Sequence, residues 1–111
     1  MKLEGAAKRL SIYIGESDQW HGHSLSGALV RRAKELGLAG ATVLRGIEGF
    51  GAHSRLHTTR ILRLSEDLPI VVELIDTAER IDGFLPVLDE MVREGLVVIE
   101  DVHVLKYEAS G

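Results

Sequence analysis

The sequence predicts an α+β fold in which a four-stranded antiparallel sheet carries two helices on one of its faces. Strand-like segments show two-residue apolar alternation or β-branched runs, and two other segments show the apolar spacing of amphipathic helices. Along the chain their order is strand, helix, strand, strand, helix, strand. Two such units with right-handed crossovers form the ferredoxin-like βαββαβ sandwich. We therefore expect residues 1–111 to form a single domain.

The first half of the chain contains a strand, a polar stretch and a helix. Apolar and polar residues alternate across residues 8–15, which predicts a half-buried strand. Residues 16–23 are polar and show no periodic pattern. From Ser24, the expected N-cap, apolar residues recur at helical spacing. Gly37 is expected to end this helix in a left-handed conformation.

The middle of the chain contains strand-like segments on both sides of a glycine-rich loop. Residues 41–48 are expected to form the second strand. Residues 60–66 and 69–76 both have strand character, and residues 67–69 (DLP) separate them. Two interpretations remain open: one strand interrupted by a bulge, or a strand that follows a short ribbon.

In the last third of the chain, the sequence pattern predicts a helix followed by a strand. Residues 76–79 (DTAE) have the pattern of a capping box and are followed by a second apolar stripe at helical spacing. Pro86 lies within this stripe, so the helix either bends there or begins anew near Asp82. Gly95 is expected to end the helix, and residues 96–107 to form the last strand.

Composition excludes several classes of protein. The net charge of -4 argues against a general nucleic-acid binder, which would carry a basic face. No apolar run approaches the roughly 18 residues that a membrane-spanning helix needs. The chain has no cysteine, which excludes disulfides, thiolate catalysis and cysteine-bound zinc. The first ten residues lack the apolar segment of a secretory signal, so we expect a cytoplasmic protein.

Residues 45–60 (RGIEGFGAHSRLHTTR) contain three glycines, three arginines and two histidines. Glycines let backbone N–H groups approach an anion, and the guanidinium fork of arginine matches phosphate oxygens. The glycine spacing is not that of a dinucleotide-binding loop, and no Gly-Lys-Ser/Thr sequence marks a P-loop. From the residues alone a phosphate site remains open, and a plain hairpin loop is the simpler interpretation.

The loop histidines raise the alternative of a metal site. His21, His23, His53 and His57 lie in the two loop segments, and zinc sites use three or more protein ligands. Solvated loop histidines explain the pattern more simply, so we predict no metal site. Ser54, beside His53 and His57, is the only local pairing of a nucleophile with a base, and neighbours in a loop seldom face one another. We therefore do not expect an enzyme.

One face of the predicted sheet has no helix to cover it. Residues 70–72 are apolar on both sides of their strand, so the open face should bury apolar side chains against other copies of the chain. Three sheets closing on one another make a homotrimer the expected assembly.

Five short segments carry a resemblance to a known family. They are residues 13–16 (YIGE), 37–43 (GLAGATV), 45–51 (RGIEGFG), 64–69 (LSEDLP) and 84–86 (FLP). On these residues the chain resembles the DUF190 (UPF0166) proteins, a branch of the PII-like (GlnB-like) superfamily, from about Lys8 to Tyr107.

The resemblance implies a trimer of ferredoxin-like subunits with adenyl nucleotides in the clefts between them. It also implies that residues 46–60 form a mobile T-loop that contacts a partner protein. The residues that match the loop base and its phosphate contacts are Arg45, Gly46, Gly49, Phe50, Gly51, His53 and Arg60. Members of the family are associated with fluoride-exporter proteins of the CrcB type, which suggests a membrane transport protein as partner.

The chain departs from the nitrogen-signalling PII proteins in two places. Its only tyrosines, Tyr13 and Tyr107, lie on predicted strands, so the uridylylated tyrosine of the T-loop is absent. Residues 92–96 (VREGL) replace the glycine- and lysine-rich segment that grips ATP phosphates. ATP and 2-oxoglutarate sensing are therefore not carried over. A smaller adenyl nucleotide, AMP, ADP or a cyclic nucleotide, is expected at least as readily as ATP, with AMP or ADP as the first candidates. Trp20 either stacks on the base or anchors the helix.

The expected function is thus a PII-like signalling protein that binds a small anionic effector and regulates a partner through a mobile loop. Two alternatives stay open: a divalent-metal-binding trimer that uses the loop histidines, and an adaptor protein without a ligand.

Overall fold

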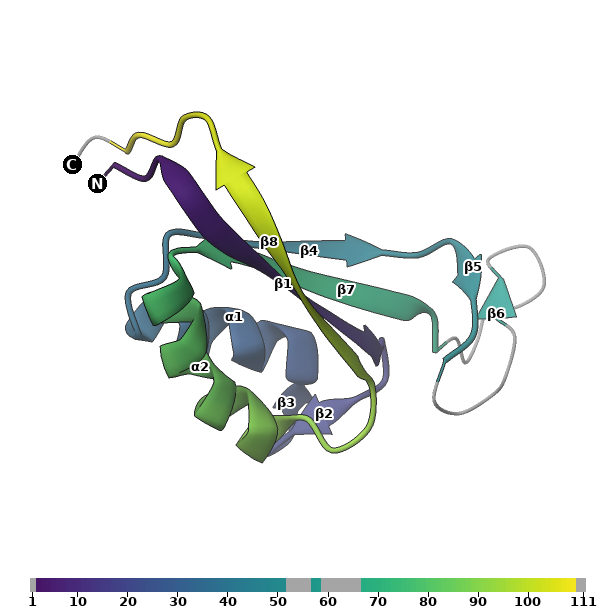
Figure 1. The fold of residues 1–111 in the computed structure, drawn as a ribbon. Coiled ribbons are helices and arrows are strands. Elements are labelled where there is room, and N and C mark those ends of the chain that lie inside the picture. The colour runs from purple at the N-terminus through teal and green to yellow at the C-terminus, as the bar shows by residue number, and fades with distance from the viewer. Residues whose placement is uncertain (1, 52–56, 59–66, 110–111) are drawn as a thin grey trace.

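The computed structural model describes residues 2–51, 57–58 and 67–109, and it confirms the predicted α+β architecture (Figure 1). The four sheet strands are β1 (Gly5–Gly15), β4 (Ala41–Arg45), β7 (Pro69–Asp76) and β8 (Leu96–Val104). They pair in the order β4-β7-β1-β8, and every pairing is antiparallel. This is the strand order that two right-handed βαβ crossovers produce.

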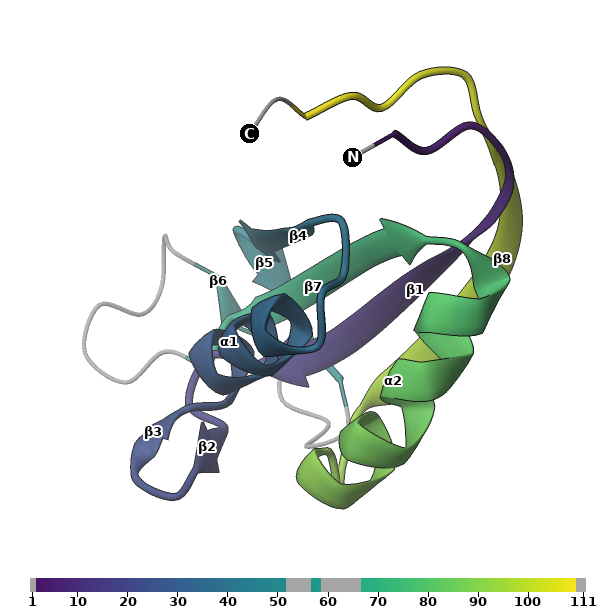
Figure 2. The ribbon, with the colours of Figure 1, turned by 90° about the vertical axis from the view of Figure 1, so that its left-hand side faces the viewer.

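Two helices cover one face of this sheet, as predicted. Helix α1 (Leu25–Glu35) follows β1, and helix α2 (Ala78–Met91) follows β7 (Figure 2). Two small hairpins lie outside the main sheet: β2 (Gln19–Trp20) with β3 (His23–Ser24), and β5 (Glu48–Gly49) with β6 (His57–Thr58). The N- and C-terminal arms run side by side at one end of the sheet, and the β5–β6 hairpin lies at the other (Figure 1). No helix in these described parts of the chain is long and apolar enough to span a bilayer.

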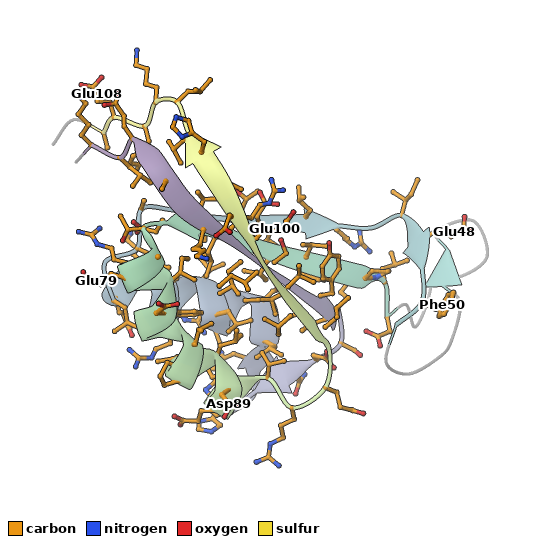
Figure 3. The ribbon with its side chains drawn as sticks, viewed as in Figure 1. Glu48, Phe50, Glu79, Asp89, Glu100 and Glu108 are labelled. Carbon is orange, nitrogen blue, oxygen red and sulfur yellow. The ribbon has the colours of Figure 1, made fainter. Side chains whose placement is uncertain are left out.

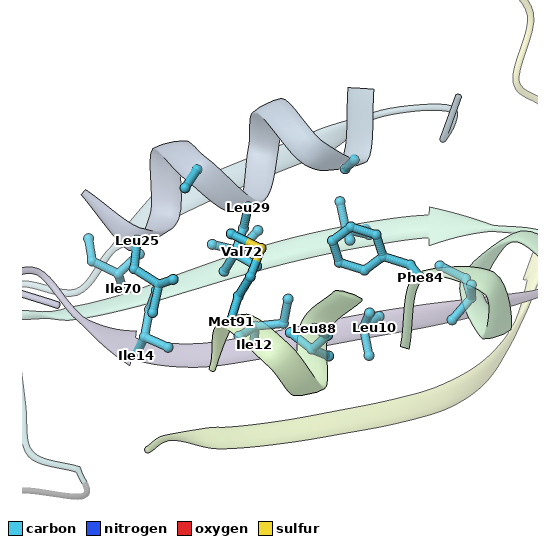
Figure 4. Packing of buried hydrophobic residues seen from close by; sticks show 14 residues of the cluster. Leu10, Ile12, Ile14, Leu25, Leu29, Ile70, Val72, Phe84, Leu88 and Met91 are labelled. Carbon is cyan, nitrogen blue, oxygen red and sulfur yellow. The ribbon is translucent and has the colours of Figure 1, made fainter. Parts of the chain in front are cut away.

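The core lies between the sheet and the helices, and the alternation of the two central strands builds it. Leu10 of β1 pairs with Leu74 of β7, and both are fully buried. Phe84 of α2 is also 0% exposed and packs in the same cluster (Figure 4). Burying one such side chain contributes roughly 1.5–3 kcal/mol, so this cluster dominates the stability of the domain.

The first helix has the predicted ends. The Ser24 hydroxyl accepts a hydrogen bond from the Gly27 backbone N–H at 3.2 Å, which makes Ser24 the N-cap. Gly37 follows the helix with a φ of +81°, the left-handed conformation that glycine adopts without a steric penalty.

The second helix begins one residue later than the predicted capping box. Thr77, not Asp76, is the N-cap, and its hydroxyl accepts from the Arg80 N–H at 3.2 Å. Asp76 is buried instead, and its carboxylate accepts from the Ala39 N–H at 2.8 Å and the Thr77 N–H at 2.7 Å. The capping-box prediction was wrong in register, because both residues are good caps and burial decides between them.

The helix runs without a break through Pro86, so a new start near Asp82 is excluded. Pro86 cannot donate a hydrogen bond to the Asp82 carbonyl. Both residues lie on the exposed side of α2, where water can satisfy that carbonyl.

Several strand boundaries differ from the predicted ones. Residues 41–48 divide into β4 and β5, the first strand begins at Gly5, and the last ends at Val104. The polar residues 16–23 contain the β2–β3 hairpin, whose turn residues His21 and Gly22 both have positive φ. The predicted strand at 60–66 lies outside the described residues.

The buried carboxylate of Asp76 leads to a stability prediction. Asp76→Ala leaves two backbone N–H groups without an acceptor, so we expect a loss of about 2–4 kcal/mol in the free energy of unfolding. Chemical denaturation at one fixed protein concentration measures this loss. Asp82→Ala, at an exposed aspartate of the following helix α2, is the matched control and should change stability by less than about 0.5 kcal/mol. Equal losses from both variants would contradict the assignment.

Candidate functional site

The end of the sheet where the chain leaves β4 is a junction built around Pro69. The Gly46 N–H donates to the Pro69 carbonyl at 2.7 Å. Gly49 lies against the proline ring with a φ of +156°, and a Cβ at this position would come within 2.9 Å of Pro69 Cγ. Only glycine fits there. The base of the loop therefore rests on the first residue of β7.

The segment after β1 joins the same junction. The Glu16 N–H donates to the Leu68 carbonyl at 2.9 Å, and the Ser17 N–H donates to the Asp67 carboxylate at 2.9 Å. The Asp18 carboxylate accepts from the Gly15 N–H at 2.9 Å and closes the turn. Three segments that are distant in sequence thus meet at one edge of the sheet.

An ion pair crosses this junction. The Arg45 Nε lies 2.9 Å from Glu16 Oε2, and Arg45 Nη2 donates to Glu16 Oε1 at 3.2 Å. The guanidinium and the carboxylate therefore form a two-point fork. The side chains of Arg45 and Glu16 are 56% and 36% exposed, so the pair is open to solvent and to a ligand.

The seven predicted site residues divide into three groups. Arg45, Gly46 and Gly49 belong to the junction, where the Gly46 N–H is already used by Pro69. Phe50 is 70% exposed beside the β5 hairpin (Figure 3), and Gly51 faces open space. The remaining two, His53 and Arg60, lie outside the described residues.

A cavity that no sequence motif indicated lies at the opposite end of β4. Its volume is about 380 Å³. Its lining residues are Leu3, Ala39, Gly40, Ala41, Thr42, Glu73, Ile75, Val104, Lys106 and Tyr107. The walls are mostly apolar, and Thr42, Glu73 and Lys106 supply a hydroxyl, a carboxylate and an amine. Ligand sites commonly combine apolar walls with a few convergent polar groups.

The C-terminal arm forms one side of this cavity. The Tyr107 hydroxyl donates to the Ala39 carbonyl at 2.8 Å, and the Leu3 N–H donates to the Tyr107 carbonyl at 3.0 Å. The carboxylate of the buried Asp76 accepts a hydrogen bond from the Ala39 N–H. Ala39 is therefore fixed through both its N–H and its carbonyl, which sets the position of the lining segment before β4.

Charged side chains on β1 and β8 pair across the two strands. Arg9 Nε donates to Glu100 Oε1 at 3.0 Å, and Lys8 donates to Asp101. The hydrogen bond from Arg9 lowers the pKa of Glu100, and the bonds from Glu100 and Asp101 raise the pKa of Arg9 and Lys8 respectively. Each shift moves the group further from neutral pH, so none of them is tuned for proton transfer near pH 7.

The described histidines give no support to the metal alternative. His21 and His23 are exposed on the β2–β3 hairpin, and no group of three or more potential ligands occurs among the residues with a described position. His53 and the side chain of His57 lie beyond that part. Trp20 packs against the core and stacks on His21, with ring centroids 4.2 Å apart. These contacts favour the helix-anchoring role of Trp20.

Comparison with known proteins places the chain in a family. Residues 7–104 match the model of the DUF190 family, which is described as "Uncharacterized ACR". A UPF0166 protein of Methanocaldococcus jannaschii is 39% identical over 103 residues, which cover 92% of this chain and 94% of the relative. A UPF0166 protein of Aquifex aeolicus is 39% identical over 98 residues, which cover 88% of this chain and 92% of that protein.

Solved structures share the fold at much lower identity. One is CPII of Thiomonas intermedia K12, a nitrogen regulatory PII-like protein bound to ADP, AMP and bicarbonate. Its TM-score is 0.55 at 22% identity, with 89% of this chain and 88% of that chain covered. The GlnK–ATP complex of B. subtilis has a TM-score of 0.58 at 8% identity, with coverages of 90% and 84%. The chain therefore belongs to the DUF190 (UPF0166) family and has the PII-like fold.

Proposed function

We propose that this protein is a cytoplasmic, PII-like regulatory protein that binds an adenyl nucleotide such as AMP or ADP between the subunits of a homotrimer. It is not an enzyme. The observation that carries the proposal is that the two candidate binding regions, the cavity and Arg45, lie at the two ends of the same short strand, β4. The PII-like neighbours with bound ADP, AMP or ATP support the choice of ligand class.

The cavity suits the base of a nucleotide. Its volume of about 380 Å³ falls within the usual range of small-molecule sites. An adenine ring has apolar faces and a polar edge. The apolar side chains of Ile75 and Val104 match the faces, and the Glu73 carboxylate and the Thr42 hydroxyl match the donors and acceptors of the edge.

Arg45 suits the phosphate. It is the last residue of β4, about 13 Å along the strand from Ala41. Thr42 pairs with Glu73, which faces away from the helices, whereas Arg45 pairs with Ile70 of the core. Residues paired across two strands share a face of the sheet, so the cavity and Arg45 lie on opposite faces of β4. A nucleotide held by both is therefore best placed between two subunits.

The open face of the sheet supports the homotrimer. Large apolar side chains remain solvent-exposed there: Tyr13 is 42% exposed, Leu44 52% and Leu96 57%. Exposed apolar surface of this kind marks an interface. We assign these residues to contacts between copies of the chain. We assign Ile47 and Phe50, beside the loop, to the contact with a partner protein such as a membrane transport protein of the fluoride-exporter type. Their side chains are 76% and 70% exposed.

Isothermal titration with AMP, ADP, ATP and cyclic di-AMP tests the nucleotide. We expect AMP or ADP to release or take up heat with one site per subunit. Glu73→Ala should weaken binding at least about ten-fold, because a hydrogen bond to a charged group contributes roughly 1.5–3 kcal/mol. Glu79→Ala, an exposed glutamate of α2 outside the cavity, is the control and should leave binding unchanged. A folded trimer that binds none of the four compounds would contradict the nucleotide proposal and favour the adaptor alternative.

Light scattering on a size-exclusion column tests the assembly. The wild-type protein should have three times the chain mass of 12.2 kDa. Leu96→Asp places a charge on the open face, where an interface would have to bury it, so the variant should be monomeric. Leu36→Asp, at the end of α1 where the leucine is 43% exposed, is the matched control and should remain trimeric. A monomeric wild type would refute the trimer.

A further inference from the structure

The fork between Glu16 and Arg45 occupies the guanidinium that the proposed function gives to the phosphate. Both contacts use the Nε/Nη2 edge of Arg45, at 2.9 and 3.2 Å. A carboxylate and a phosphate present the same pair of oxygens to such an edge. With Glu16 in place, a ligand phosphate and the Glu16 carboxylate compete for one set of donors.

The backbone holds both partners of this ion pair in position. The Glu16 N–H donates to the Leu68 carbonyl, and the neighbouring Ser17 N–H donates to Asp67. On the other side, the Gly46 N–H next to Arg45 donates to the Pro69 carbonyl. Most exposed ion pairs are weak because two mobile side chains must be ordered to form them. Here both backbones are already held in place, so only the two side chains have to be ordered.

We propose that Glu16 is a built-in occupant of the anion site and sets its specificity. Without a ligand, its carboxylate takes the place of the phosphate on Arg45. A nucleotide phosphate, which carries up to two negative charges, displaces the single charge of Glu16, whereas a neutral nucleoside does not. Competition from Glu16 thus raises the ligand concentration needed to occupy the site. It also favours nucleotides with a strongly charged phosphate. This inference rests on the proposed nucleotide site.

Displacement has a structural consequence within the same junction. Glu16 directly follows β1 and precedes the β2–β3 hairpin, and Arg45 directly precedes the base of the loop. When the phosphate takes Arg45, the side-chain link between these two segments is lost, while the backbone bonds to Pro69 and Leu68 remain. Ligand binding therefore changes one contact at the loop base, the ion pair between Arg45 and Glu16.

Titration of three proteins with AMP, ADP and adenosine tests the inference. The proteins are the wild type, Glu16→Gln and Glu48→Gln. Glu16→Gln removes the competing charge, so we expect it to bind AMP and ADP about three- to five-fold more tightly, the upper part of the range that an exposed ion pair supplies. Its affinity for adenosine should be unchanged. Glu48→Gln makes the same change in net charge on the nearby β5 and should leave all three affinities within two-fold of wild type.

The other outcomes contradict either the role of Glu16 or the nucleotide site itself. Unchanged or weaker binding of AMP by Glu16→Gln, with a normal thermal transition, would overturn the role of Glu16 while the nucleotide site stands. An equal gain for adenosine, or the same gain from Glu48→Gln, would also overturn it, because the effect would not depend on the contact with Arg45. If the folded wild type binds neither AMP nor ADP, the proposed function fails, and the inference fails with it.

Discussion

The hydrogen bond from the Gly46 N–H to the Pro69 carbonyl is the contact on which the loop end of the molecule depends. It ends the pairing of β4 with β7 at a defined residue and places Arg45 at the edge of the sheet. Gly49 packs on the same proline ring. Asp67 and Leu68, the residues before Pro69, accept hydrogen bonds from the segment after β1. One short turn thus sets the geometry of three segments.

The other end of β4 is fixed in a similar way by different chemistry. The buried Asp76 accepts from the Ala39 N–H, and the Tyr107 hydroxyl donates to the Ala39 carbonyl. The strand between these two anchors is only five residues long. Its pleat turns the cavity and Arg45 to opposite faces of the sheet. In the proposed function these are two halves of one site, and because they lie on opposite faces a neighbouring copy is needed to complete it. This requirement connects the proposed ligand to the proposed assembly.

The fold could be predicted because its signals are local. The alternation of β1, the apolar run of β7 and the cap at Ser24 need only neighbouring residues to be recognised. The cavity could not be predicted, since it forms where the C-terminal arm folds back to Ala39, a contact that leaves no periodic pattern. Glu16 was missed for a related reason: it lies in a polar stretch, and its partner is 29 residues away. The resemblance placed the loop glycines at the base of the loop beside a ligand, but no sequence pattern indicates that the Gly46 N–H is bonded to the Pro69 carbonyl.

The most direct test of the central claim is a crystal structure of the protein grown with ADP. Our account predicts a trimer with the adenine in the cavity beside Glu73 of one subunit and the phosphates at Arg45 of the next. The Glu16 carboxylate should have left the Arg45 guanidinium. Well-ordered trimers with empty clefts, or ADP bound away from both ends of β4, would contradict it.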